Sequence, residues 1–103
     1  IITGGENVYP REVEEIIFTI PDVQECAVVG LPDREWGERV VAFVIPKSGK
    51  SLQAADLKTF LKQRLSAFKI PKEFIMVDEL PKNSTGKILK REIRKQFNKT
   101  VQK

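Results

Sequence analysis

The sequence predicts an α+β fold, in which a small three-stranded sheet is flanked by helices and preceded by an N-terminal β-hairpin. Runs rich in β-branched residues occur three times along the chain, at residues 23–31, 38–46 and 73–77. Segments with apolar residues at every third or fourth position also occur three times, at about residues 10–20, 54–65 and 90–98. A chain of 103 residues can bury one modest core, so we expect residues 1–103 to form a single domain.

The N-terminal segment predicts a hairpin followed by a helix. Residues 1–8 form two extended pieces around Gly4 and Gly5, which can adopt backbone angles that other residues avoid and let a ligand approach closely. Pro10 suits the first position of a helix, and Pro21 stops that helix. One face of the helix is apolar and consists of Val13, Ile16, Ile17 and Ile20.

The two central strands are predicted to be covered on both faces. Residues 27–29 and 40–45 are apolar at successive positions, whereas a half-exposed strand would alternate. A turn is predicted between these strands at residues 32–37. The helix that follows them presents one apolar stripe to the core, formed by Leu57, Phe60, Leu61 and Leu65.

The last helix is predicted to be amphipathic, with a basic outer face. Its apolar contacts fall every fourth residue, at Leu89, Ile93 and Phe97. Residues 82–103 have a net charge of +7, whereas residues 1–81 have a net charge of −3. This asymmetry indicates an anionic partner. A nucleic acid is disfavoured because the basic segment lacks interleaved aromatic residues and any known reading motif.

Composition excludes several classes of site. One cysteine and no histidine exclude a disulfide framework, the usual zinc sites and Ser-His or Cys-His nucleophilic chemistry within the chain, so no metal site is predicted. Cys26 lies in an apolar strand-like run, which predicts a core thiol in a reducing cytoplasm. The longest apolar run, residues 40–45, is too short to span a bilayer. The chain begins inside a predicted strand without an initiator methionine, so we expect it to be part of a longer protein.

Lys87 is the residue most clearly placed for chemistry. It lies in the polar turn of residues 81–88, directly after Gly86, and the next acid along the chain is Glu92. Such a turn holds a side chain away from the body of a domain, where a charged ammonium can meet an anion elsewhere. A phosphate-binding P-loop is excluded because no Ser or Thr follows Lys87 and the glycine spacing is wrong. Composition alone would favour an ordinary solvated lysine.

Three stretches together resemble the C-terminal domain of the adenylate-forming acyl- and aryl-CoA synthetases. They are residues 2–14 (ITGGENVYPREVE), residues 30–38 (GLPDREWGE) and residues 80–88 (LPKNSTGKI). Each stretch alone is a weak signal, but the three occur in the family's order and cover nearly the whole chain. The resemblance implies the fold of that domain.

The resemblance also implies roles for individual residues. Lys87 matches the lysine that closes over the active site during adenylation, between the substrate carboxylate and the α-phosphate of ATP. Gly4, Gly5 and Glu6 match the segment that lines the channel for the pantetheine arm of CoA, although a plain hairpin turn is the simpler interpretation of the glycines. Residues that would hold the nucleotide end of CoA are Trp36, Phe68 and Lys72.

This last assignment has two qualifications that the residues themselves impose. Trp36 and Phe68 would also suit the core or rim of any small domain. Some relatives carry an arginine where Ile70 stands, so the phosphate contacts in this pocket are expected to be fewer or differently supplied.

The reaction implied is that of an ATP-dependent acid–CoA ligase, which converts an acid, ATP and CoA to acyl-CoA, AMP and pyrophosphate. The chain would be its mobile C-terminal lid. ATP, Mg²⁺ and the carboxylic acid would bind mainly to an N-terminal domain that is not part of this sequence, so this chain alone is expected to be inactive.

Two alternatives remain open at the level of sequence. One is an adenylating relative that does not use CoA, such as a carrier-protein-loading domain or a luciferase. The other is a stand-alone basic module that binds RNA or an acidic protein.

Overall fold

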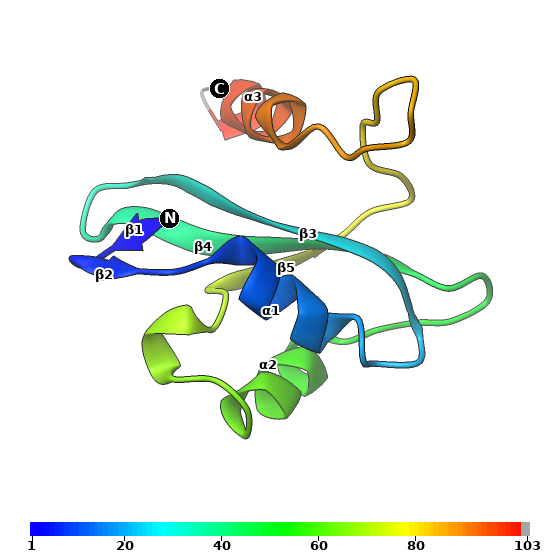
Figure 1. Cartoon of the computed structure of the whole chain (residues 1–103), viewed down its shortest axis with the longest axis horizontal. Coiled ribbons are helices and arrows are strands. Elements are labelled where there is room, and N and C mark those ends of the chain that lie inside the picture. Colours follow the sequence, from blue (N-terminus) through cyan, green and yellow to red (C-terminus); the bar gives the residue numbers. More distant parts are fainter. Residues whose placement is uncertain (102–103) are drawn as a thin grey trace.

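The chain folds as a layer of helices on each face of a mixed sheet (Figure 1). The computed structural model describes the backbone of residues 1–101 and the side chains of residues 1–97. The strands are β1 (Ile2–Thr3), β2 (Glu6–Asn7), β3 (Val23–Asp33), β4 (Gly37–Pro46) and β5 (Glu73–Met76). The helices are α1 (Pro10–Ile17), α2 (Ala54–Lys62), the 3₁₀ turn η1 (Ala67–Lys69) and α3 (Lys90–Val101).

The sheet is built around β4. Its long antiparallel pairing with β3 runs from Val23 opposite Pro46 to Asp33 opposite Gly37. On its other edge β4 pairs in parallel with β5, which confirms the predicted three-stranded sheet. The predicted hairpin, β1 and β2, is also present. It joins the same edge of β4 through Thr3 opposite Gly37, so the sheet has five strands in all.

Both faces of the sheet are buried, as the continuous apolar runs predict. Alternate residues of β3 and β4 point to opposite sides, and each side packs under its own helices. The first core lies under α1 and α2; its buried residues include Val13, Ile17, Val28, Ala42, Val44, Leu57 and Leu61. The second core lies under α3; its buried residues are Ala27, Val29, Leu31, Val41, Phe43, Ile45, Leu80 and Ile93.

Cys26 belongs to the first core, as predicted. Cys26 is 2% exposed, and its Sγ lies 3.7 Å from the carbonyl oxygen of Glu14 on α1. Burial, followed by the negative charge of Glu14, raises the pKa of Cys26 to about 12. The thiol is therefore neutral at physiological pH and suited to packing rather than to nucleophilic chemistry.

Two helices end earlier than their apolar stripes predict. The stripe of α1 continues to Ile20, but the chain tightens after Ile17, where the Thr19 hydroxyl and N–H both donate to the carbonyl of Ile16. The stripe of α2 continues to Leu65, but a similar tight turn brings the Arg64 N–H to the carbonyl of Leu61. The extra residues of both stripes still pack against the first core.

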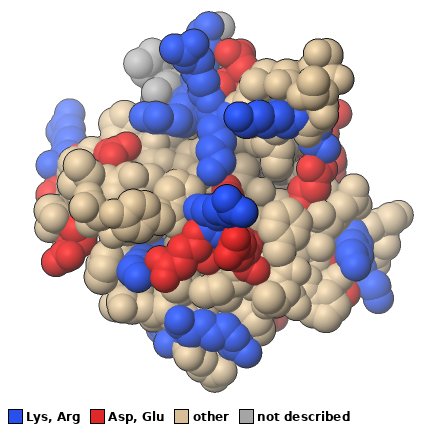
Figure 2. All heavy atoms as spheres, in the orientation of Figure 1, with Lys and Arg blue, Asp and Glu red and all other residues tan. Residues whose placement is uncertain are grey.

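The basic C-terminal segment is fastened to the acidic body of the chain by ion pairs. Lys82 Nζ lies 2.8 Å from Glu25 of β3, and Lys90 Nζ lies 2.7 Å from Glu14 of α1. An Arg94 nitrogen lies 3.9 Å from Glu38 of β4. Figure 2 shows the blue side chains gathered around α3 at the top of the view, with acids below them. Three charges of the basic segment are therefore matched within the chain. Lys99 and Lys103 lie outside the described side chains.

The pair between Glu14 and Lys90 is expected to contribute most to stability. The Glu14 side chain is 17% exposed, and one of its oxygens accepts both from Lys90 Nζ and, at 2.8 Å, from the N–H of Val28. Glu14→Ala should lower the free energy of unfolding by about 2 kcal/mol, because a buried N–H and an ammonium each lose an acceptor. Urea denaturation of the chain measures this change.

The matched control is Glu15→Ala on the same helix. Glu15 pairs with Arg11 at 3.1 Å, but both side chains are largely exposed, so the loss should stay within about 0.5 kcal/mol. Equal losses for the two variants would show that the Glu14 contacts add nothing beyond a surface charge pair.

No helix within residues 1–101 is both long enough and apolar enough to cross a membrane.

Candidate functional site

Lys87 is presented by a short closed loop between β5 and α3. The two ends of the loop pair across an isolated antiparallel bridge of Lys82 with Ile88, and the Asn83 N–H donates to the carbonyl of Lys87 at 2.9 Å. The Lys87 side chain is exposed, and among the described side chains it forms no ion pair or hydrogen bond through Nζ. The loop therefore fixes the backbone of Lys87 and leaves its ammonium free.

The side chain of Asn83 organises this loop. Its Oδ1 accepts three hydrogen bonds: from the N–H of Thr85 at 3.0 Å, the hydroxyl of Thr85 at 2.7 Å and the N–H of Lys87 at 2.9 Å. Gly86 lies between them with φ +86°, a conformation that side chains disfavour, and donates its N–H to the Asn83 carbonyl. Sequence reasoning predicted a polar turn but assigned no role to Asn83. An Asn that begins a Ser-Thr-Gly turn is a recognisable signal for such bonding.

The other predicted site residues meet at one cavity at the opposite end of the molecule. This cavity, which we name the CoA-face cavity after the role that the resemblance implies for its residues, has a volume of about 270 Å³ and is lined by Thr3, Gly4, Glu6, Trp36, Ala67, Phe68 and Lys72. They come from the β1–β2 hairpin, the β3–β4 turn, η1 and the residue before β5, which are distant in the sequence. Gly5 does not line the cavity but lies beside it at the exposed tip of the hairpin.

Gly4 holds the hairpin against Trp36. The Gly4 N–H donates to the Trp36 carbonyl at 2.8 Å, and a Cβ at Gly4 would lie 2.8 Å from Trp36 Cε3. Both the φ of +56° and the close approach therefore require glycine. On its other side Trp36 is oriented by Asp33, whose Oδ1 accepts the N–H groups of Glu35 and Trp36, each at 2.9 Å. The backbone of Trp36 is thus held on both sides, by Gly4 and by Asp33.

The CoA-face cavity combines exposed aromatic rings with a positive charge. Trp36 is 41% exposed and Phe68 is 39% exposed, which rules out the interpretation of either as a core residue. Lys72 Nζ lies 4.4 Å from the centre of the Trp36 ring. Lys69 Nζ lies 5.7 Å from the centre of the Phe68 ring. Flat aromatic rings can stack on the planar base of a nucleotide, and an ammonium group beside them can pair with its phosphates.

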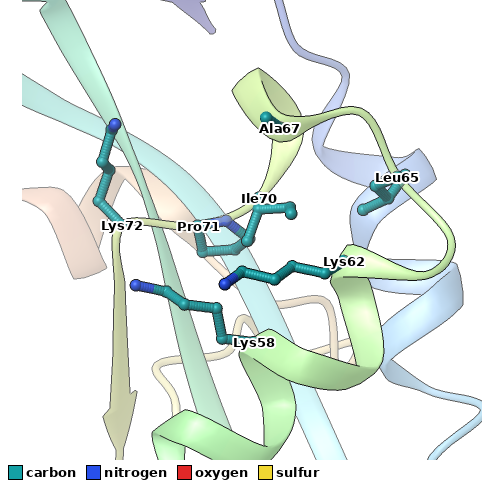
Figure 3. Close-up of a pocket in the computed structure, with 7 residues that line it drawn as sticks. All are labelled: Lys58, Lys62, Leu65, Ala67, Ile70, Pro71 and Lys72. Carbon is teal, nitrogen blue, oxygen red and sulfur yellow. The ribbon is translucent and has the colours of Figure 1, made fainter.

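A second cavity lies on the other side of η1 (Figure 3). It is open, has a volume of about 480 Å³ and shares Ala67 and Lys72 with the CoA-face cavity. Its remaining lining residues are Lys58, Lys62, Leu65, Ile70 and Pro71. Sequence reasoning missed Lys58 and Lys62, which look like the polar face of α2; their spacing of four residues was the available signal.

The structure does not bring Lys87 together with the CoA-face cavity. In Figure 1 the β1–β2 hairpin lies at the left end of the sheet, whereas the loop before α3 lies above the right-hand part, on the side that α3 covers. The two sets of candidate residues therefore occupy different faces of one body. In the part of the chain with described side chains, no group of His, Cys, Asp and Glu could hold a metal ion.

Comparison with known proteins identifies relatives of the chain. It is 45% identical over 97 residues to the feruloyl-CoA synthase of Amycolatopsis sp, and 46% identical over 97 residues to the fatty acid–[acyl-carrier-protein] ligase ScoC of Streptomyces coeruleorubidus. Each match covers 94% of this chain but only 20% and 19% of the two relatives. The chain thus spans about one fifth of the length of these proteins.

The fold agrees with these sequence matches. ATP-bound MatB from Rhodopseudomonas palustris superposes with a TM-score of 0.91 at 41% identity, over 94% of this chain and 19% of that one. The family model of the AMP-binding enzyme C-terminal domain matches residues 12–87, which include the Trp36 turn, η1 and the Lys87 loop. The chain therefore belongs to the AMP-binding enzyme C-terminal domain family.

Proposed function

We propose that residues 1–103 form the mobile C-terminal domain of an ATP-dependent acid–CoA ligase, which converts an acid, ATP and CoA to acyl-CoA, AMP and pyrophosphate. The observation that carries the proposal is the separation of two sites on one rigid body. The Lys87 ammonium is exposed on one face, and a cavity lined by the Trp36 and Phe68 rings and by Lys72 lies on another. Two half-reactions that share a single reaction centre need such an arrangement, because each requires different groups in the same place.

In the first half-reaction a carboxylate oxygen of the acid attacks the α-phosphorus of ATP, and the bond to pyrophosphate breaks. Lys87 would place its ammonium between the carboxylate and the α-phosphate. Negative charge is concentrated there as the two anions approach, and a fixed positive group stabilises the transition state. Mg²⁺ would neutralise further charge on the phosphates. Its ligands, together with the ATP and acid pockets, are expected in the N-terminal domain.

In the second half-reaction the domain rotates, Lys87 withdraws and the hairpin of Gly4 and Gly5 reaches the reaction centre. The CoA thiol gives up its proton and attacks the carbonyl carbon of acyl-AMP, and the bond to AMP breaks. The two glycines, which carry no side chain, and the neighbouring Glu6 would line the pantetheine channel. Trp36 and Phe68 would stack on the adenine, and Lys72 would pair with a phosphate.

The CoA-face cavity favours CoA over a carrier protein as the acceptor. A carrier protein brings a pantetheine arm but no adenine, so it has no use for two exposed rings beside the ammonium of Lys72. One relative, ScoC, is nevertheless named as an acyl-carrier-protein ligase. The discriminating experiment supplies the intact enzyme with acid and ATP, adds CoA or a carrier protein, and measures AMP release. AMP release that depends on CoA supports the proposal. AMP release that occurs with the carrier protein but not with CoA contradicts it.

A stand-alone RNA-binding role is disfavoured by the ion pairs of Lys82, Lys90 and Arg94, which neutralise part of the basic segment. Non-specific RNA binding relies on free cations and weakens steeply with salt. A salt-sensitive RNA gel shift by the purified chain would support that alternative, and no shift would remove it.

Asn83→Ala is expected to slow acyl-AMP formation roughly tenfold to hundredfold without changing the second step. The variant keeps Lys87 but removes the acceptor of three hydrogen bonds. The backbone of the loop is then no longer held in place, so the Lys87 ammonium is positioned less accurately. Acid-dependent exchange of pyrophosphate into ATP measures the first step. Ser84→Ala, an exposed neighbour in the same loop, is the matched control and should behave as wild type. Full exchange activity in Asn83→Ala would contradict the positioning role.

A further inference from the structure

Arg39 of β4 joins three parts of the chain that are distant in the sequence. Its Nε donates to a carboxylate oxygen of Glu73 at 2.8 Å, and its Nη1 donates to the backbone carbonyl of Pro32 at 2.7 Å. The guanidinium carbon lies 5.7 Å from the centre of the Phe97 ring on α3. Because the Arg39 side chain is only 22% exposed, these contacts hold the guanidinium in one place.

Arg39 lies behind the CoA-face cavity and not in it. Val41 and Phe43 of the same strand belong to the core under α3, and alternate residues of a strand share a face. Arg39 is therefore on the α3 face, and it is not among the lining residues of the cavity. Leu65 and Ile70, on either side of η1, pack on the other core. Any effect of Arg39 on a ligand in the cavity must therefore act through the segments that it holds.

The two segments that Arg39 joins carry the side chains that define the cavity. Pro32 opens the turn that contains Trp36, and Glu73 directly follows Lys72. Within the cavity Lys72 Nζ lies 4.4 Å from the centre of the Trp36 ring. One planar guanidinium thus links the segment of the ring to the segment of the ammonium.

The same contact occupies the acid that lies next to Lys72 in the sequence. Arg39 pairs with Glu73, whereas Lys72 forms no ion pair among the described side chains. An unpaired carboxylate beside Lys72 would compete with a phosphate for its ammonium. Arg39 therefore holds Glu73 on the α3 face and leaves Lys72 available on the cavity side.

We propose that Arg39 is a positioning residue for CoA, an inference that rests on the proposed function. It fixes the spacing between the Trp36 ring, which would stack on the adenine, and the Lys72 ammonium, which would pair with a phosphate. Arginine suits this role because its rigid fork presents several donors in fixed directions, whereas lysine offers one ammonium on a flexible stem. A preorganised pair of binding groups raises affinity because less ordering is needed when the ligand binds.

The test measures both half-reactions of the intact enzyme that contains this domain. In Arg39→Ala the KM for CoA should rise about tenfold, the loss expected when hydrogen bonds of a charged group are removed. Pyrophosphate exchange, and thioester formation at saturating CoA, should both stay within about twofold of wild type. Arg39→Lys should also raise the KM for CoA, because one ammonium does not reproduce the two separate bonds to Pro32 and Glu73.

A double variant tests whether Arg39 acts through Trp36. Trp36→Ala alone should raise the KM for CoA, since it removes a stacking ring. Adding Arg39→Ala should raise that KM by no more than about twofold, because the effects of two residues that act on one contact do not add. Arg91→Ala is the matched control: it removes the same charge from an exposed position on α3 and should leave both half-reactions unchanged.

Three results would overturn the positioning role while the ligase function stands. They are an unchanged KM for CoA in Arg39→Ala, a wild-type KM in Arg39→Lys, and a further rise of about tenfold when Arg39→Ala is added to Trp36→Ala. A loss of pyrophosphate exchange in Arg39→Ala as large as the loss of CoA affinity would also overturn it, because general damage to the fold acts on both steps. Absence of any thioester from wild-type enzyme supplied with acid, ATP and CoA would instead overturn the proposed function.

Discussion

Lys87→Ala in the intact enzyme is expected to lower the rate of acyl-AMP formation by about 10²–10³, the loss typical of removing one preorganised electrostatic donor. Thioester formation from supplied acyl-AMP should stay within about twofold of wild type, because in the proposed mechanism the second step uses the hairpin and not the Lys87 loop. The fold should not change, since the side chain is exposed and Nζ forms no ion pair or hydrogen bond with a described side chain.

The two half-reactions are measured separately, by pyrophosphate exchange for the first and by single-turnover thioester formation for the second. Lys95→Ala is the matched control, because Lys95 is an exposed lysine of the neighbouring α3 and its loss changes the net charge equally. An equal loss of both half-reactions in Lys87→Ala would contradict a role confined to adenylation. So would a similar loss in Lys95→Ala, which would point to the general positive field of the segment.

Gly5→Leu is expected to show the reverse pattern, with acyl-AMP formation retained and thioester formation slowed by about 10²-fold. Gly5 has φ +81° at the tip of the hairpin, and a Cβ placed there would meet no atom of this chain within 4 Å. The leucine side chain would therefore point away from the domain, into the space proposed for the pantetheine arm. Its obstruction would act on the approach of the thiol and leave the Lys87 loop untouched.

Backbone strain is the competing explanation for such a loss, and the chain offers a control for it. Gly49 has φ +76°, and a Cβ there would also meet no atom within 4 Å, but this glycine lies in the loop after β4. Gly49→Leu introduces a similar left-handed strain of about 1–2 kcal/mol without reaching the hairpin. If Gly49→Leu slowed thioester formation as much as Gly5→Leu, or if Gly5→Leu left that step intact, the channel would be assigned to the wrong segment.

Much of the fold could be predicted from the sequence because its signals are local. Successive apolar residues at 27–29 and 40–45 indicated a sheet buried on both faces, and the two cores under α1, α2 and α3 confirm this. The helix ends were less accurate, because apolar stripes continue past the last helical residue wherever a tight turn still packs on the core. Pairing of Thr3 with Gly37, which adds the hairpin to the sheet, depends on residues far apart in the sequence and has no local signature.

The candidate site likewise contains residues that the sequence indicates locally and others that only the folded structure brings together. Lys87 stands in a polar turn that the sequence displays directly, whereas the CoA-face cavity joins distant stretches that only the resemblance grouped together. Asn83 acts through three hydrogen bonds to its Oδ1; the turn motif suggests such bonding but does not say which groups donate. Lys58 and Lys62 line one cavity with Ile70 and Pro71. Their spacing of four residues places them on one face of α2 but does not predict that the segment after η1 lies beside that face.

The ion pair of Glu14 with Lys90 links the two faces to which the proposed half-reactions are assigned. Glu14 lies on α1, directly after the glycine hairpin, and Lys90 opens α3, directly after the Lys87 loop. Both helices also pack on β3, so the two faces are fixed relative to each other. In the proposed ligase, the orientation of this body relative to the N-terminal domain would then describe both half-reactions. One pair of fluorescent labels, with one on each domain, would be enough to record the order and timing of the two steps.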